Sequence, residues 1–226
     1  MPEVNVYLEK DASVWQTYQD LNFGSPSNPL WAGYYAKNDR LNFLMKANLN
    51  SYVPSGSTIN SASLNIYIQS ISAVQLGPYR FTRINTTARP WEEEHVVPYY
   101  PGCTWINYVT TDYGVGTPWT IAGAMGSGDQ YPSEYFDSGY VTAPGLWSIP
   151  CTAWIQHAWA PAHDPVQHVQ GVIDLVCSTN RLTPAEGVAE YLTAYNRHDY
   201  ADYYPYFLVD YTPPAGTPAR VQAHFF

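Results

Sequence analysis

Hydrophobic and polar residues alternate along several short stretches of the chain, a pattern typical of β-strands with one packed face and one solvated face. In residues 4–15 the alternation places Val4, Val6 and Leu8 on one face. Residues 62–71 carry the clearest pattern, with Ala62, Leu64, Ile66 and Ile68 facing one way and Ser63, Asn65, Tyr67 and Gln69 the other. The sequence therefore predicts antiparallel strands over both stretches.

Further strands are expected over residues 41–49, 79–84, 169–179 and 206–211. In the first of these, one face carries Leu41, Phe43, Met45 and Ala47, and the other carries Asn42, Leu44, Lys46 and Asn48. Residues 169–179 read as a buried strand with Ile173, Leu175 and Cys177 on one face. Turn-forming residues separate these stretches, as expected between short strands.

One short helix is expected, over "IPCTAWIQHAWA" at residues 149–160, with Thr152 as its cap and Pro161 as its end. Residues 85–147 are rich in Pro, Gly and Tyr and show the least regular pattern. Many short strands with almost no helix predict an all-β fold, an antiparallel β-sandwich of jelly-roll type. An immunoglobulin-like sandwich is the second alternative, disfavoured by the long irregular segment. We expect one sandwich domain over residues 1–212 and a Pro-rich tail over 213–226.

Composition and charge narrow the function classes. The chain has 226 residues, of which only 13% are charged, and its net charge is −9. Such a chain is repelled by phosphate backbones, so we expect no nucleic-acid partner. No apolar run reaches the length of a membrane span, and the first fifteen residues lack the basic start and apolar core of a signal peptide. We therefore expect neither membrane insertion nor a signal peptide.

Three cysteines, Cys103, Cys151 and Cys177, are widely spaced. Their odd number and spacing match neither a zinc pattern nor a disulfide framework. We expect small buried side chains, with a single bridge between Cys151 and Cys177 as the alternative.

Residues 38–68, "NDRLNFLMKANLNSYVPSGSTINSASLNIYI", resemble the signature of DNRLRE-type domains, in which a charged motif leads into a strand. The segment "RPWEEE" is similar to the family's Trp-x-Glu motif at Trp91 and Glu93, and "CTWINY" to its motif around Trp105. The closing stretch "YNRHDYADYYPYFLVDYT" is similar around Arg197. The chain departs from the family pattern in three places: Asn38 and Asp39 are reversed, Asn42 replaces an Arg, and His198 replaces a Glu.

The resemblance implies a jelly-roll sandwich found in extracellular, cell-surface and phage structural proteins. Some relatives are carbohydrate-binding modules with alginate among their ligands, and some are expected to carry a structural calcium. Oxygen ligands from loops suit calcium. The acidic candidates are Asp11, Asp20, Asp112, Asp129 and Asp137. We interpret the motif residues as structural rather than catalytic: Asp39, Arg40, Trp91, Glu93, Trp105 and Arg197.

The acidic run "WEEE" at residues 91–94 is the densest cluster of carboxylates. Neighbouring residues on a strand point to opposite faces, so the run does not build the facing pair of a glycosidase. We expect Trp91 in the core, one glutamate paired with Arg83 or Arg197, and Arg40 paired with Asp39 or a glutamate of this run. No nucleophile-elbow, phosphate-loop or dinucleotide motif is present, so we expect no enzyme.

Two other features bear on binding. Histidines and an aspartate that could hold a transition metal lie in a segment interrupted by Pro161 and Pro165: His157, His163, Asp164 and His168. The stretch "NPLWAGYYAKN" reads as an exposed loop whose aromatic residues, Trp31, Tyr34 and Tyr35, suit a sugar or a protein partner. The first hypothesis is a structural or decoration module on the surface of a virion or similar extracellular assembly, in contact with other protein subunits. The alternative is a secreted module binding an acidic polysaccharide such as alginate.

Overall fold

The computed structural model describes residues 2–21, 23–24, 28–73, 76–85, 90–93, 102–112, 115–160, 169–179, 188–198 and 201–216. Within these ranges the chain forms twelve strands, one α-helix and two short 3₁₀ helices. In chain order they are β1 (Glu3–Trp15), β2 (Leu30–Ala36), β3 (Asp39–Asn48), η1 (Leu49–Ser51), β4 (Thr58–Ile71), β5 (Tyr79–Ile84), β6 (Asn107–Asp112), β7 (Val115–Pro118), β8 (Gln130–Asp137), β9 (Gly145–Pro150), α1 (Thr152–Trp159), β10 (Val172–Thr179), β11 (Glu190–Ala194), η2 (Ala201–Tyr203) and β12 (Tyr206–Thr212).

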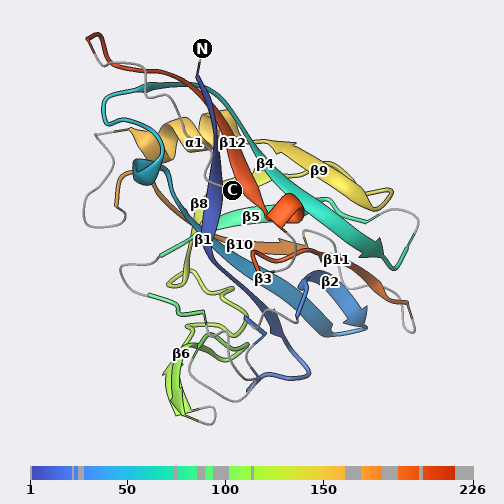
Figure 1. Ribbon diagram of the computed structural model, residues 1–226. Coiled ribbons are helices and arrows are strands. Elements are labelled where there is room, and N and C mark those ends of the chain that lie inside the picture. The colour runs from blue at the N-terminus through green and yellow to red at the C-terminus, as the bar shows by residue number, and fades with distance from the viewer. Residues whose placement is uncertain are drawn as a thin grey trace.

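The protein is an all-β fold of antiparallel sheets packed as a sandwich, which confirms the expected all-β sandwich class. One layer contains β12, β4 and β9, and the other contains β3, β10, β5 and β8 (Figure 1). The long strand β1 belongs to both layers. Its first half pairs with β12 from Glu3 to Tyr7, and its second half pairs with β3 from Leu8 to Trp15. The register shifts between Leu8 and Lys10, so an irregularity marks the point where β1 changes sheet.

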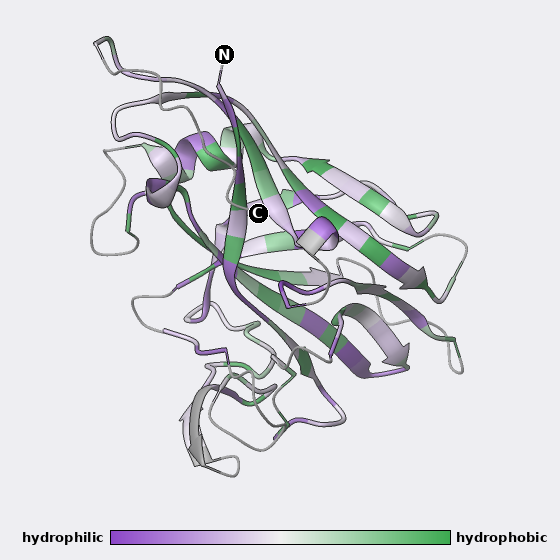
Figure 2. Cartoon of the chain, in the orientation of Figure 1, coloured by the Kyte–Doolittle hydropathy of each residue, from purple (hydrophilic) through white to green (hydrophobic). Residues whose placement is uncertain are grey.

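The main core lies between the two layers. Apolar residues from the inward faces of β1, β3, β4, β5, β10 and β12 form one buried cluster. The expected alternation is confirmed at Leu64 and Ile66, which are fully buried, and at Ser63 and Tyr67, which stay partly exposed. Asn65, expected on the solvated face, is buried instead. Bands of hydrophobic and hydrophilic residues follow one another along β4 and β3 (Figure 2). The hydrophobic pattern of the sequence therefore predicted the positions of these strands correctly.

A second core covers the opposite face of β3 and β10. Leu44 and Val176 project from these strands into a cluster with residues of the irregular middle segment. That cluster contains Ala12, Val14, Ile84, Trp91, Cys103, Trp105, Trp119 and Ala124. The outer face of β3 is therefore buried as well, and Asn42 on that face donates from Nδ2 to the carbonyl of Gly123 at 3.0 Å. The middle segment acts as an additional layer over the sandwich.

The expected helix is present as α1, and it packs Trp154, Ile155 and Ala158 into the main core. The expected cap is wrong, because Thr152 is the first helical residue and the N-cap is Cys151. The backbone N–H of Cys151 still donates to the carbonyl of Ala62, which extends the pairing of β9 with β4. The helix therefore begins after Cys151, at Thr152. The Thr152 hydroxyl instead accepts from the backbone N–H of Ala62 at 3.0 Å.

The three cysteines are buried and free, so the alternative of a bridge between Cys151 and Cys177 is wrong. Burial raises the pKa of Cys151 to about 12 and raises the pKa values of Cys103 and Cys177. The thiols therefore stay protonated at neutral pH and serve as small core side chains.

Candidate functional site

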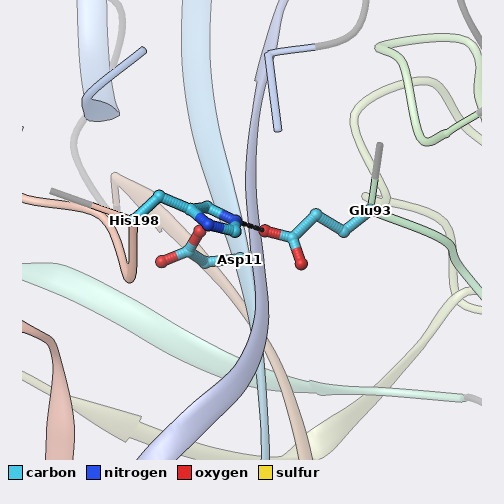
Figure 3. A group of neighbouring side chains, drawn as sticks. All are labelled: Asp11, Glu93 and His198. Atoms are coloured by element: carbon cyan, nitrogen blue, oxygen red, sulfur yellow. Dashed lines mark hydrogen bonds and ion pairs between the residues drawn. The ribbon is translucent and has the colours of Figure 1, made fainter. Parts of the chain in front are cut away.

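Four side chains from distant parts of the chain meet beside β1. Asp11 comes from β1, Glu93 from the segment before β6, and Arg197 and His198 from the turn after β11. Figure 3 shows Asp11, Glu93 and His198 pointing toward one another. Arg197 Nη2 donates to Glu93 Oε2 at 2.7 Å, and His198 Nε2 lies 3.0 Å from Glu93 Oε1. The backbone N–H of Arg197 donates to Asp11 Oδ2 at 2.7 Å. The expected pairing of a glutamate with Arg197 is thus present, and His198 joins it.

The cluster is nearly closed to solvent. Asp11 is 1% exposed and the Glu93 side chain 3%, whereas Arg197 and His198 cover them from the outer side with 28% and 17% exposed. Burial and the adjacent Glu93 carboxylate raise the pKa of Asp11 well above its usual range, against the opposing effect of Arg197. The buried carboxylate of Glu93 therefore faces the guanidinium of Arg197. The carboxyl group of Asp11 is shifted toward its neutral form.

The same atoms have the spacing of metal ligands. One nitrogen of His198 and one oxygen each of Asp11 and Glu93 lie within 4.8 Å of one another, the single such group in the described residues. Both oxygens of Glu93, however, already accept hydrogen bonds from Arg197, whose positive charge opposes a cation at this place. The donor set also contains an imidazole, which calcium disfavours. The cluster fits a structural ion pair better than the expected calcium site.

The other calcium candidates do not gather around a common point in the described part of the chain. Asp129 accepts backbone hydrogen bonds from Thr120, Ile121 and Gly126 at 2.7 to 3.0 Å and thereby shapes a turn. Asp137 is paired with Arg80. Asp20 is exposed, and the side chain of Asp112 lies outside the described residues. Of the group expected to hold a transition metal, His163, Asp164 and His168 lie outside the described residues.

The described residues of the acidic run, Trp91 to Glu93, each have a different partner. Trp91 is 2% exposed and its Nε1 donates to Asp174 Oδ1 at 3.0 Å, so it lies in the second core as expected of a packed residue. Glu92 pairs with Lys10 at the surface. Arg83 pairs with Glu134 rather than with the run, and Glu94 lies outside the described residues. Trp105, 6% exposed, also belongs to the second core.

The motif pair Asp39 and Arg40 does not form the expected contact. Asp39 Oδ1 accepts from Trp15 Nε1 at 2.9 Å and from the backbone N–H of Thr17 at 3.0 Å. Arg40 Nη2 donates to the Tyr34 hydroxyl at 2.8 Å. Adjacent residues of an extended strand project to opposite faces, so the two side chains cannot face each other. The prediction that Arg40 pairs with Asp39 or with the acidic run is wrong for the described residues.

A hollow of about 340 Å³ lies beside Arg40. It is open on one side and lies between the start of β3 and the turn at residues 120–129. Its walls are formed by Gln16, Tyr34, Asn38, Arg40, Trp105, Ile121, Ala122 and Met125. Sequence patterns gave no signal for this hollow, because its walls come from four separate stretches of the chain.

The aromatic stretch predicted as a loop is the strand β2. Tyr34 is only 3% exposed, so its predicted exposure is wrong, whereas Tyr35 is 50% exposed and Trp31 is half-buried. Gly33 allows β2 to pair closely with β11, because a Cβ at this position would lie 2.2 Å from the carbonyl oxygen of Glu190. The close approach of the two backbones explains how a Gly- and Tyr-rich stretch joins the sheet.

Trp31 and Tyr35 belong to a larger surface group, called the aromatic patch below. It consists of Trp15, Tyr18, Phe23, Trp31, Tyr35 and Tyr191. Trp15 lies at its centre, with ring centroids 4.8 Å from Tyr18, 5.4 Å from Trp31 and 5.2 Å from Tyr35. Tyr18 is 47% exposed, so the patch offers two half-exposed rings on a packed aromatic base. Trp15, Tyr18 and Phe23 were missed at the sequence level because the order of residues along the chain does not show which rings meet in space.

A separate group of tyrosines lies over β1, β12 and η2. Tyr195 and Tyr203 stack with centroids 4.6 Å apart, and Tyr203 also contacts Tyr67 of β4. Tyr7 contacts Tyr206, its partner across the β1–β12 pairing. Unlike the aromatic patch, this group contains no Trp or Phe.

Comparisons with known proteins assign no family. The scan against protein-family models gives no match, and the search of curated proteins likewise gives none. The similarity to DNRLRE-type domains stays a prediction from the sequence. In the described residues, no helix combines the length and apolarity that crossing a membrane requires.

Proposed function

We propose that this protein is a non-catalytic structural module of an extracellular assembly, such as the surface of a virion, and that it docks on a neighbouring protein subunit through the aromatic patch. The observation that carries the proposal is the exposure of Tyr18 and Tyr35 on a packed base of Trp15 and Trp31. Aromatic residues held in this way are enriched at the centres of protein interfaces. Rigid rings also lose little conformational entropy on binding.

The arrangement of the carboxylates supports a non-catalytic role. A glycosidase requires two carboxyl groups that flank a sugar. In the part of the chain that the structure describes, the neighbouring carboxyl groups of Asp11 and Glu93 are buried, and Glu93 is held by Arg197. Glu92 is paired with Lys10, and Asp129 caps a turn. The described carboxylates named here are thus engaged in stabilising the fold.

The test measures binding of the purified chain to the isolated virion or extracellular assembly of its source. We expect the double variant Tyr18→Ser/Tyr35→Ser to bind at least tenfold more weakly, because hot-spot aromatics each contribute about 1–2 kcal/mol or more. Tyr140→Ser is the matched control, since Tyr140 is 55% exposed and lies outside the patch. Equal binding by the double variant and by wild type contradicts the proposal.

A second candidate is binding of an acidic polysaccharide such as alginate. The observation that favours it is the half-buried guanidinium of Arg40 beside an open hollow. Binding across a panel of acidic and neutral polysaccharides, measured by isothermal titration calorimetry, tests this candidate. Binding confined to acidic chains and lost in Arg40→Gln supports it, and no binding to any member of the panel contradicts it.

A further inference from the structure

The polar side of the hollow beside Arg40 consists of hydrogen-bond donors. Gln16 uses its side-chain oxygen to accept from the backbone N–H of Arg40 at 3.1 Å, so its amide NH₂ is directed elsewhere. Asn38 lies in the β2–β3 turn with φ 66° and contributes a second amide group. Among the described residues that line the hollow, none carries a carboxylate, although the protein has a net charge of −9. The polar wall therefore suits an anion.

The guanidinium of Arg40 has spare donor capacity. An arginine side chain carries five N–H donors. In the described part of the chain, one of them is used, by Nη2 toward the Tyr34 hydroxyl. The neighbouring Asp39 carboxylate is engaged on the other side of the strand by Trp15 and Thr17. A guanidinium held by one neutral partner can still bind a carboxylate with two parallel hydrogen bonds.

The opposite wall is aliphatic and fixed in place. Ile121, 57% exposed, and Met125 extend from the turn that Asp129 holds through its hydrogen bonds to Thr120, Ile121 and Gly126. Trp105 also lines the hollow, but Gly123 covers its ring, since a Cβ on Gly123 would lie 2.7 to 2.9 Å from three ring atoms. A sugar therefore finds no open aromatic face here, whereas an aliphatic side chain finds apolar contacts.

We propose that the hollow binds a single aspartate or glutamate side chain, flanked by an aliphatic residue, from the neighbouring protein subunit. The inference rests on the proposed function, which supplies that neighbour. The net charge of −9 favours a single carboxylate over a polyuronate, because each further negative charge is repelled by the acidic surface. A peptide segment with one acidic and one aliphatic side chain satisfies both walls.

The hollow and the aromatic patch use opposite faces of β2 and β3, because adjacent residues of a strand project to opposite faces. Tyr34 and Arg40 line the hollow, whereas their neighbours Tyr35 and Asp39 contact Trp15 of the patch. The acidic side chain that enters the hollow therefore makes a contact separate from the patch. The aromatic rings supply contact area, and Arg40 supplies specificity and register.

The first test uses the dipeptide N-acetyl-Leu-Glu-amide as the probe, with binding followed by NMR chemical-shift changes. We expect saturable binding that weakens about tenfold or more for N-acetyl-Leu-Gln-amide and for Arg40→Gln, as loss of a charge-assisted hydrogen bond predicts. Arg40→Lys keeps the positive charge but cannot form two parallel hydrogen bonds, so we expect an intermediate loss of affinity. Ile121→Ser weakens the contact with the leucine of the dipeptide without affecting folding. Equal affinity for the two dipeptides, or tighter binding of glucuronate than of either, overturns the inference.

The second test separates this inference from the proposed function. Binding to the assembly is compared for wild type, Arg40→Gln and the control Arg80→Gln, with thermal melting as a folding control. Arg80 is partly exposed and lies outside the hollow. Loss of binding in Arg40→Gln alone supports the hollow as a contact. If wild type and Arg40→Gln bind the assembly equally, the inference fails while the proposed function stands. If wild type does not bind the assembly, the proposed function fails, and with it the neighbour that the inference requires.

Discussion

Arg197 and Glu93, 104 positions apart in the chain, meet through three hydrogen bonds of 2.7 to 3.1 Å. The pair connects the turn after β11 to the start of the middle segment, and the backbone N–H of Arg197 adds a bond to Asp11 of β1. The second core is therefore joined to the sandwich by an ion pair as well as by apolar packing.

Glu93→Ala leaves the Arg197 guanidinium without its carboxylate partner in a largely buried place. We expect the free energy of unfolding to fall by about 3–5 kcal/mol, the usual effect of removing one partner from a buried pair. Urea denaturation measures the change. The matched control is Glu92→Ala, whose exposed pair with Lys10 contributes about 0–1 kcal/mol. Similar losses in the two variants would contradict a special role for Glu93.

Asp174 gives the protein a defined pH dependence. Burial raises its pKa from 3.8 to about 6, although Lys46 and the hydrogen bond from Trp91 act in the opposite direction. Below pH 3.8 the carboxyl is protonated in both the folded and the unfolded state, so it has no effect. Between pH 3.8 and about 6 the folded state retains the proton that the unfolded state releases, so stability falls as the pH rises and levels off above about 6.

The stability of wild type relative to Asp174→Asn should therefore fall by up to about 3 kcal/mol between pH 3.5 and pH 7. Urea denaturation of both proteins at several pH values measures this difference, and contributions from other titrating groups cancel in it. A difference that is independent of pH would show that Asp174 ionises in the folded state as readily as in the unfolded state.

Gly123 lies against the Trp105 ring and has a φ of +80°. Gly123→Ala should destabilise the protein by about 1–3 kcal/mol more than the matched variant Gly216→Ala, because overpacking adds to the backbone strain. Gly216 has a φ of +85° but nothing within 4 Å of an added Cβ. Thermal and urea denaturation give the comparison. Equal effects would mean that the turn at residues 120–129 does not pack on Trp105 as described.

Divalent ions test the interpretation of the cluster around Asp11. Since Arg197 already neutralises Glu93, we expect zinc or calcium at millimolar concentration, or a chelator, to leave the melting temperature unchanged. A rise in melting temperature with zinc that disappears in His198→Ala would instead identify a metal site.

The sequence predicted β1, β3, β4, β5, β10 and β12 largely because their apolar residues alternate, and it did not predict β8, β9 or β11. Leu64 and Ile66 on β4, and Ile173 and Leu175 on β10, lie in the main core as the period of two requires. The β2 strand was missed because Gly33 and the adjacent tyrosines resemble a turn, and only the close approach to Glu190 on β11 explains it. Local pattern cannot report such a backbone contact.

The second core and the side-chain clusters were less predictable for a related reason. Leu44 lies on the face of β3 expected to be solvated, and its burial depends on a middle segment that has no regular pattern. The convergence of Asp11 and His198 on Glu93 joins residues from opposite ends of the chain. The partner of Arg40 was wrong because strand geometry separates it from Asp39. Tertiary structure decides each of these points.

Hydroxyl-radical footprinting of the intact assembly and of the free chain tests the proposed docking surface most directly. Tyr18 and Tyr35 are about half exposed in the free protein, as is the control Tyr140. Docking through the aromatic patch predicts that Tyr18 and Tyr35 become protected in the assembly while oxidation of Tyr140 is unchanged. Equal oxidation of Tyr18 and Tyr35 in the free chain and in the assembly would contradict docking through the aromatic patch.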